Sequence, residues 1–84
     1  MSRQEKLIKR LLSNPKDFTW DELKKLLGNF GYEMLNGKGS RRKFIHRETK
    51  QVINLHEPHP QNIMKKYAID DVIDKLKELG YINE

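Results

Sequence analysis

The sequence predicts an α+β fold in the order helix, helix, strand, strand, strand, helix. Apolar residues recur at the 3.6-residue spacing of amphipathic helices in three segments: residues 3–13, 19–31 and 69–79. Three short runs suited to strands lie between the second and third of these segments: residues 32–35, 40–46 and 51–56. Because these runs are joined by short turns, we expect a three-stranded antiparallel sheet with the helices on one of its faces.

The first two helices carry recognisable end signals. Asn14-Pro15 ends the first, since proline lacks an amide donor and disfavours helical geometry in the residue before it. Thr19 and Glu22 have the spacing of a capping box, in which a hydroxyl and a carboxylate bind unpaired amides at a helix start. Gly31 is a plausible left-handed cap at the end of the second helix.

The third helix is indicated by one apolar stripe, made of Ile69, Val72, Ile73, Leu76 and Leu79. We expect Asp70 and Asp71 to lie in its first turn, and Lys75 and Lys77 to lie in its last turn. This placement of charges suits the helix dipole. Gly80 then ends the helix.

The hairpin of the second and third strands has a predicted register. Asn36-Gly37-Lys38-Gly39 is a turn sequence before the hairpin, and the hairpin itself turns around residues 47–50. If Arg47 and Lys50 are opposed, paired positions sum to 97. One face then holds His46 with Gln51, Phe44 with Ile53, and Arg42 with Leu55. The other face holds Ile45 with Val52, Lys43 with Asn54, and Arg41 with His56. A slip of one residue would exchange the faces.

Length and composition restrict the class of protein. Eighty-four residues make one domain with a thin core, so a deep substrate cavity is not expected. The chain has no cysteine, which excludes disulfides and thiolate metal sites. It has no apolar run of about 18 residues that could span a membrane. The charged N-terminus does not look like a secretion signal, and we expect a cytoplasmic protein.

Positive charge is concentrated in the hairpin. The net charge is +5, and residues 38–50 alone contribute six basic side chains against one acidic side chain. A focused positive field attracts polyanions. Glycine-rich backbone beside it, at Gly37 and Gly39, can approach a phosphate closely, and Ser40 can donate to phosphate oxygens. The alternative is that the basic residues only protect a solvated sheet edge from aggregation.

Three histidines fall within fourteen residues: His46, His56 and His59. Imidazole both accepts and donates protons near neutral pH, and RNA can be cut without a metal when a base removes the 2′-hydroxyl proton. Cations then stabilise the charge that develops on phosphorus. His56 and His59 could instead cap turns, and a zinc site has too few suitable ligands. Trp20 and Tyr67 could stack on bases, but both adjoin apolar stripes and are more typical of core or rim residues.

The arrangement of these parts resembles the HicA family of toxins from toxin–antitoxin pairs. The resemblance covers Thr19 to Gly80 and includes Lys38-Gly39-Ser40, the two following strands, the Pro58-His59-Pro60 loop and the last helix. It implies a single HicA-like RNA-binding domain over residues 1–84, with 1–18 as a helical extension and 19–80 as the core. The implied fold is similar to a double-stranded-RNA-binding domain.

The resemblance also implies an activity and a partner. Family members are ribosome-independent mRNA interferases, and a HicB antitoxin covers the active face. Neither a metal nor a cofactor is implied. The RNA-binding residues would be Lys38, Ser40, Arg41, Arg42, Lys43 and Asn54.

One position departs from the family pattern. Typical members have a catalytic histidine directly after Gly-Ser, where this chain has Arg41, and arginine cannot act as a general base because it stays protonated. Either the imidazole role has moved, or the protein binds RNA without cutting it. His56 is favoured because it is opposite Arg41, His59 ranks second through its proline-flanked loop, and His46 is third. A remaining alternative is a basic face that serves only an acidic protein partner.

Overall fold

The computed structural model describes residues 3–82, so the two residues at each end of the expected 1–84 domain lie outside the described range. The element order is α1 Arg3–Leu12, α2 Trp20–Asn29, β1 Tyr32–Asn36, β2 Arg41–His46, β3 Val52–His56 and α3 Lys66–Glu78. The strands form one antiparallel sheet in the order β1-β2-β3. The predicted α+β fold is confirmed. Three of the six strand ends differ from the expected positions by one residue, namely the end of β1 and the starts of β2 and β3.

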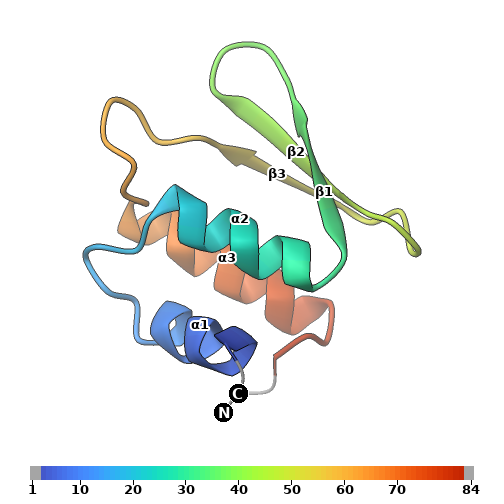
Figure 1. Ribbon diagram of the computed structural model, residues 1–84, viewed down its shortest axis with the longest axis horizontal. Helices are drawn as coiled ribbons and strands as arrows, with labels where there is room; N and C mark the ends of the chain where they lie inside the picture. Colours follow the sequence, from blue (N-terminus) through green and yellow to red (C-terminus); the bar gives the residue numbers. More distant parts are fainter. Residues whose placement is uncertain (1–2, 83–84) are drawn as a thin grey trace.

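The elements are arranged in layers (Figure 1). The sheet lies on one side of α2 and α3, and α1 lies beyond these helices, away from the sheet. Buried residues of every layer join in one core, including Leu11 of α1, Leu26 of α2, Phe44 of β2 and Leu76 of α3. The prediction of helices on one face is therefore confirmed. The opposite face of the sheet, which we call the outward face, is left uncovered within residues 3–82.

The capping box at the start of α2 is confirmed. The Glu22 amide donates to Thr19 Oγ1 over 3.1 Å, and the Thr19 amide donates to Glu22 Oε1 over 3.1 Å. Arg10 of α1 donates to both carboxylate oxygens of Glu22, over 2.6 and 3.2 Å, and so joins α1 to α2. This hydrogen bond from Arg10 holds the pKa of Glu22 below its ordinary value. Trp20 is buried in the core, as its position beside an apolar stripe suggested.

The start of α3 corrects the sequence prediction. The helix begins at Lys66, a full turn before the apolar stripe, so placing Asp70 and Asp71 in its first turn was wrong. The first turn begins with the exposed residues Lys66 and Tyr67, and its Ala68 is only half-buried, so the turn does not extend the apolar stripe and the sequence pattern did not reveal it. Lys75 and Lys77 do lie in the last turn, and Gly80 follows with a φ of +85°.

Gly31, after α2, adopts the positive φ that the sequence indicated. Its φ is +103°, a conformation that residues with a Cβ rarely adopt. A Cβ at this position would lie 3.0 Å from Nε2 of His46, so the absence of a side chain also makes room for the imidazole ring. Gly31 therefore connects α2 to β1 and allows close approach of the hairpin.

Candidate nucleic-acid interface

The hairpin has the predicted register. Arg41 pairs with His56, Lys43 with Asn54, and Phe44 with Ile53. Phe44 and Ile53 are buried against the helices, whereas the other members of these pairs are exposed. Because side chains alternate along a strand, the outward face presents four polar groups together: Arg41, Lys43, Asn54 and His56. Directly opposed side chains are about 5 Å apart at Cβ, so Arg41 and His56 are immediate neighbours.

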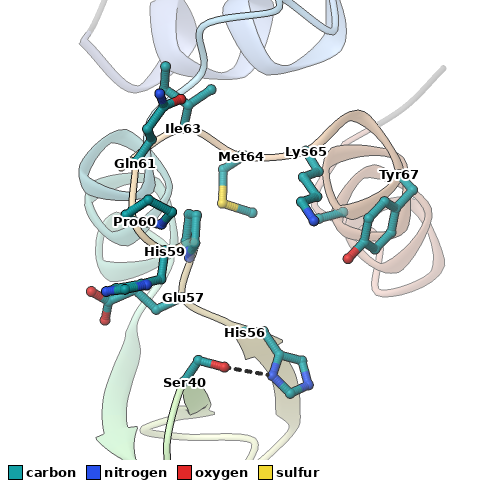
Figure 2. Close-up of a pocket in the computed structure, with 12 residues that line it drawn as sticks. Ser40, His56, Glu57, His59, Pro60, Gln61, Ile63, Met64, Lys65 and Tyr67 are labelled. Atoms are coloured by element: carbon teal, nitrogen blue, oxygen red, sulfur yellow. Dashed lines mark hydrogen bonds between the residues drawn. The ribbon is translucent and has the colours of Figure 1, made fainter.

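His56 is held from one side by Ser40 (Figure 2). Ser40 Oγ lies 3.2 Å from Nδ1 of His56, and the Glu57 amide donates to the Ser40 carbonyl over 2.8 Å, which continues the strand pairing by one step. In the tautomer that donates Nδ1–H to the hydroxyl, Nε2 keeps its lone pair. Nε2 has no hydrogen-bond partner in the part of the chain that the structure describes. The imidazole is thus oriented, with one nitrogen available to a ligand.

Arg42, predicted to bind RNA, does not join this face. It is on the side of Phe44, and its side chain is only 18% exposed. Its Nε donates to Glu57 Oε1 over 3.0 Å, and one terminal nitrogen donates to the carbonyls of Gly39 and Arg41 over 2.9 and 2.7 Å. The guanidinium therefore links the loop before β2 to the residue after β3. Nε and this terminal nitrogen are used within the protein, and a positioning role suits this geometry.

Lys38 remains exposed in the loop between β1 and β2. It lines a surface hollow with seven other residues of the hairpin and the loop before it: Gly37, Arg41, Arg42, Lys43, Asn54, Leu55 and His56. Six of the predicted RNA-binding or catalytic residues thus border one surface depression, with Arg42 reaching it from the inner side of the sheet. The positive charges of Lys38, Arg41 and Lys43 make this depression attractive to a phosphate.

His46 lies at the other end of the hairpin and is used structurally. Its Nε2 is 2.9 Å from the Phe30 carbonyl oxygen, and its Nδ1 accepts from the amides of Glu48 and Thr49 over 3.1 and 3.2 Å. The ring packs edge-on against Tyr32 at 5.0 Å between centroids. Since both ring nitrogens are engaged, the structure does not bring His46 into the site with His56.

His59 lies beside a second hollow of about 500 Å³, between the end of β3 and the start of α3. Ser40 and His56 border the same hollow. Figure 2 shows the His59 ring on the opposite side of the chain from the His56 ring, so the two imidazoles do not point toward one another.

Two residues of this hollow received too little weight from the sequence. Lys65 and Tyr67 line it from the start of α3, and Tyr67 is 66% exposed. Lys65-Lys66, shortly before the apolar stripe, indicated a cationic helix start. The sequence did not indicate that Lys65 and Tyr67 lie near His56, because nine or more positions separate them from it in the chain. Among residues 3–82, histidine and acidic side chains form no cluster of three or more that could hold a metal.

Fold and face together define a small α+β protein whose open sheet displays cations and an oriented imidazole, a combination suited to binding a polyanion. Comparison with protein families agrees: the model of the HicA toxin of bacterial toxin–antitoxin systems matches residues 20–81. The chain belongs to the HicA toxin family. No curated protein and no solved structure matched the chain.

The family match begins after α1 and ends after α3, so it includes the whole outward face. It also spans both hollows and all three histidines. In the described residues, no helix has the length and apolar character needed to cross a membrane.

Proposed function

We propose that this toxin is a metal-independent endoribonuclease that cuts mRNA in the cytoplasm, with His56 as its general base. The observation that carries the proposal is the juxtaposition of His56 with Arg41 and Lys43 on the exposed face of the hairpin. Nδ1 of His56 is anchored on Ser40, and Nε2 is unoccupied within the described residues. A general base needs this combination of fixed orientation and an accessible lone pair.

The chemistry follows from these groups. Nε2 of His56 removes the proton of a ribose 2′-hydroxyl, the 2′-oxygen attacks the adjacent phosphorus, and the bond to the 5′-oxygen breaks. The leaving oxygen takes up a proton from water, and the products are a 2′,3′-cyclic phosphate and a 5′-hydroxyl end. Arg41 and Lys43 stabilise the negative charge that grows on the phosphoryl oxygens. The nucleophile belongs to the substrate, so DNA is not cut.

The departure at Arg41 fits this assignment. The family resemblance puts the usual imidazole at this position, and the register puts His56 directly across from it on the same face. The imidazole has thus changed strands while staying at one end of the hairpin. Arg41 contributes charge, as arginine does at phosphate sites. His59 is a weaker candidate, because its ring lies on the other side of the chain from that of His56.

A second candidate function is RNA binding without cleavage. It is favoured by Arg41 itself, because a permanently protonated side chain stands where the family resemblance leads us to expect the catalytic histidine. The same cations would then bind phosphates only. Affinity for single-stranded RNA would fall with salt by roughly 0.7 log unit per contacted phosphate for each log unit of salt.

The proposed partner is a HicB-like antitoxin that covers the outward face. Family membership implies pairing with an antitoxin. Next to the cations, the outward face also carries apolar side chains, of which Leu35 is 49% exposed and Val52 is 38% exposed. A face with both exposed apolar groups and cations suits a protein partner with acidic residues around an apolar centre. The pairing is tested by induced expression alone and together with the protein of any small reading frame found next to this one.

The activity is tested on purified protein with an end-labelled mRNA in buffer containing EDTA. We expect cleavage by the wild-type protein, retention of cleavage by His59→Ala at reduced rate, and loss of cleavage by His56→Ala. Mass spectrometry of the fragments should show 2′,3′-cyclic phosphate ends. A substrate with 2′-deoxy sugars throughout should stay intact.

Arg41→His separates the two candidate functions. If the wild-type protein binds RNA but does not cut it, and Arg41→His gains cleavage, the non-catalytic function is correct and the assignment of His56 is rejected. If the wild-type protein cuts in EDTA and His56→Ala does not, the endonuclease proposal stands. Equal cleavage by wild type and His56→Ala would reject the assignment of the base.

A further inference from the structure

We infer that the hollow between the end of β3 and the start of α3 is a nucleotide subsite, in which one base of the bound RNA stacks on Tyr67. The inference rests on the proposed function in that it names how the same site holds its substrate. It differs from that function in concerning binding and not bond cleavage. The residues that carry it are Tyr67, Lys65, His56 and the proline-rich loop opposite them.

The exposure of Tyr67 is unusual for a large aromatic side chain in this protein. Tyr67 is 66% exposed, whereas Trp20 and Tyr32 are buried and Phe30 packs on Tyr81. Within residues 3–82, the Tyr67 ring has no aromatic neighbour and its hydroxyl has no hydrogen-bond partner. Tyr67 thus presents an apolar ring to solvent with little role in the core, and an exposed aromatic ring is what a nucleobase needs for stacking.

The shape of the hollow suits a nucleotide. Its volume of about 500 Å³ is within the range of small-molecule sites. Figure 2 shows Tyr67 and Lys65 on one side, at the start of α3, and His59, Pro60 and Gln61 on the other side, along the loop. Pro58 and Pro60 restrict the backbone of this loop, so the wall is stiff before a ligand arrives.

The floor and the polar groups of the hollow support the same ligand. Met64, which is 4% exposed, contributes an apolar floor. The Gln61 side-chain amide, at the rim, has one group that donates and one that accepts, as base edges require. Lys65 supplies a positive charge for a backbone phosphate. The one acidic side chain among the lining residues, Glu57, is paired with Arg42 over 3.0 Å, which offsets its repulsion of phosphate.

The hollow also shares His56, the proposed general base, with the basic depression. His56 borders both this hollow and the basic depression lined by Lys38, Arg41 and Lys43. An RNA strand with its reactive phosphate at His56 therefore has cations on one side and an aromatic ring on the other. A protein partner would use the ring differently, through apolar side chains and without dependence on a nucleobase.

The test measures binding to RNA that cannot be cut. The probes are fluorescein-labelled 12-nucleotide strands with 2′-O-methyl sugars, one complete and a series with a single abasic position moved along the strand. Tyr67→Ala removes the ring on which the base stacks, so it should weaken binding of the complete strand about tenfold. Tyr67→Phe should bind like the wild-type protein, because the ring is retained.

The abasic strands identify the contact. At one position in the series, removal of the base should lower the affinity of the wild-type protein for the strand by a similar factor. The affinity of Tyr67→Ala should not change at that position. Lys65→Ala should reduce the salt dependence of binding by about one phosphate contact, and Lys77→Ala is its matched control, since it removes the same charge at the other end of α3. Thermal unfolding of each variant verifies that the fold is retained.

The outcomes separate this inference from the proposed function. If Tyr67→Ala binds the complete strand as tightly as the wild-type protein, or loses affinity equally for every abasic strand, the subsite is rejected even where cleavage is observed. If the wild-type protein does not cut RNA but the abasic series identifies one stacked base, the subsite stands and only the endonuclease activity is rejected. Loss of antitoxin binding alone on Tyr67→Ala would reject the subsite in favour of a protein contact.

Discussion

The two ends of the β2–β3 hairpin each hold a histidine, and the two side chains are used in opposite ways. His46 has both ring nitrogens bound to backbone groups and its ring packed on Tyr32. His56 has one nitrogen on Ser40, and its ring is on the exposed face beside Arg41. The residue type is the same, so the difference comes from alternation along the strands and from the neighbours that each face provides. An imidazole is available for chemistry only where the backbone leaves a nitrogen unpaired.

The largest expected effect is on RNA cleavage and comes from the end of the hairpin that holds His56. We expect His56→Ala to lower the rate of RNA cleavage by about 10²- to 10⁴-fold, because a general base commonly contributes this factor. The midpoint of thermal unfolding should stay within error of wild type, since the side chain is exposed and bonded only to Ser40. The measurements are single-turnover cleavage and circular dichroism. A large loss of stability would contradict the difference between the two histidines, because it would give His56 a structural role.

Gly31→Ala tests the end of the hairpin that holds His46. The new Cβ would lie 3.0 Å from Nε2 of His46, on a residue with a φ of +103°. We expect a loss of about 2–3 kcal/mol in the free energy of unfolding, from backbone strain and displacement of the imidazole. Urea denaturation measures it. Gly28→Ala is the matched control, because it places a Cβ in open space at the end of α2 and should be neutral or stabilising.

His46→Ala should separate stability from activity in the opposite sense to His56→Ala. It removes the contacts to the Phe30 carbonyl and the amides of Glu48 and Thr49, so we expect a loss of about 1–2 kcal/mol in stability. Cleavage per folded molecule should be unchanged. A loss of cleavage in protein shown to be folded would mean that His46 also takes part in RNA cleavage.

Ser40→Ala is expected to have the smallest effect. Loss of one hydrogen bond that orients the His56 ring should reduce the cleavage rate about two- to tenfold, without change in unfolding. Ser40→Thr keeps a hydroxyl and should retain more of the rate. Equal rates for wild type and Ser40→Ala would show that the hairpin alone orients the ring.

The hairpin and its surroundings differ in how far the sequence predicts them. The hairpin register follows from local alternation and turn residues, so the pairing of Arg41 with His56 was predicted correctly. The surroundings of His46 were not, because Phe30 and Tyr81 reach it through tertiary contacts. The same holds for Arg42, whose partner Glu57 follows the opposite strand.

The loop between β3 and α3 was the least predictable segment. It is placed by long-range contacts: the Met64 amide donates to the Phe18 carbonyl over 2.7 Å, and Ile63 bridges to Thr19. These contacts bring Lys65 and Tyr67 close to His56, although no periodic pattern in residues 57–67 marks the approach. A hollow formed by a loop and a helix start has no local sequence signature, in contrast to a hairpin.

The guanidinium of Arg42 has a consequence for how rigid the reactive centre is. By binding the Gly39 carbonyl on one side and the Glu57 carboxylate on the other, it ties together the two chain segments that carry Ser40 and His56. A lysine has a single ammonium in place of this planar fork and could not span both. In the proposed mechanism, the accuracy with which the imidazole meets RNA therefore depends on an arginine whose side chain is only 18% exposed and whose Nε and one terminal nitrogen bind groups of the protein.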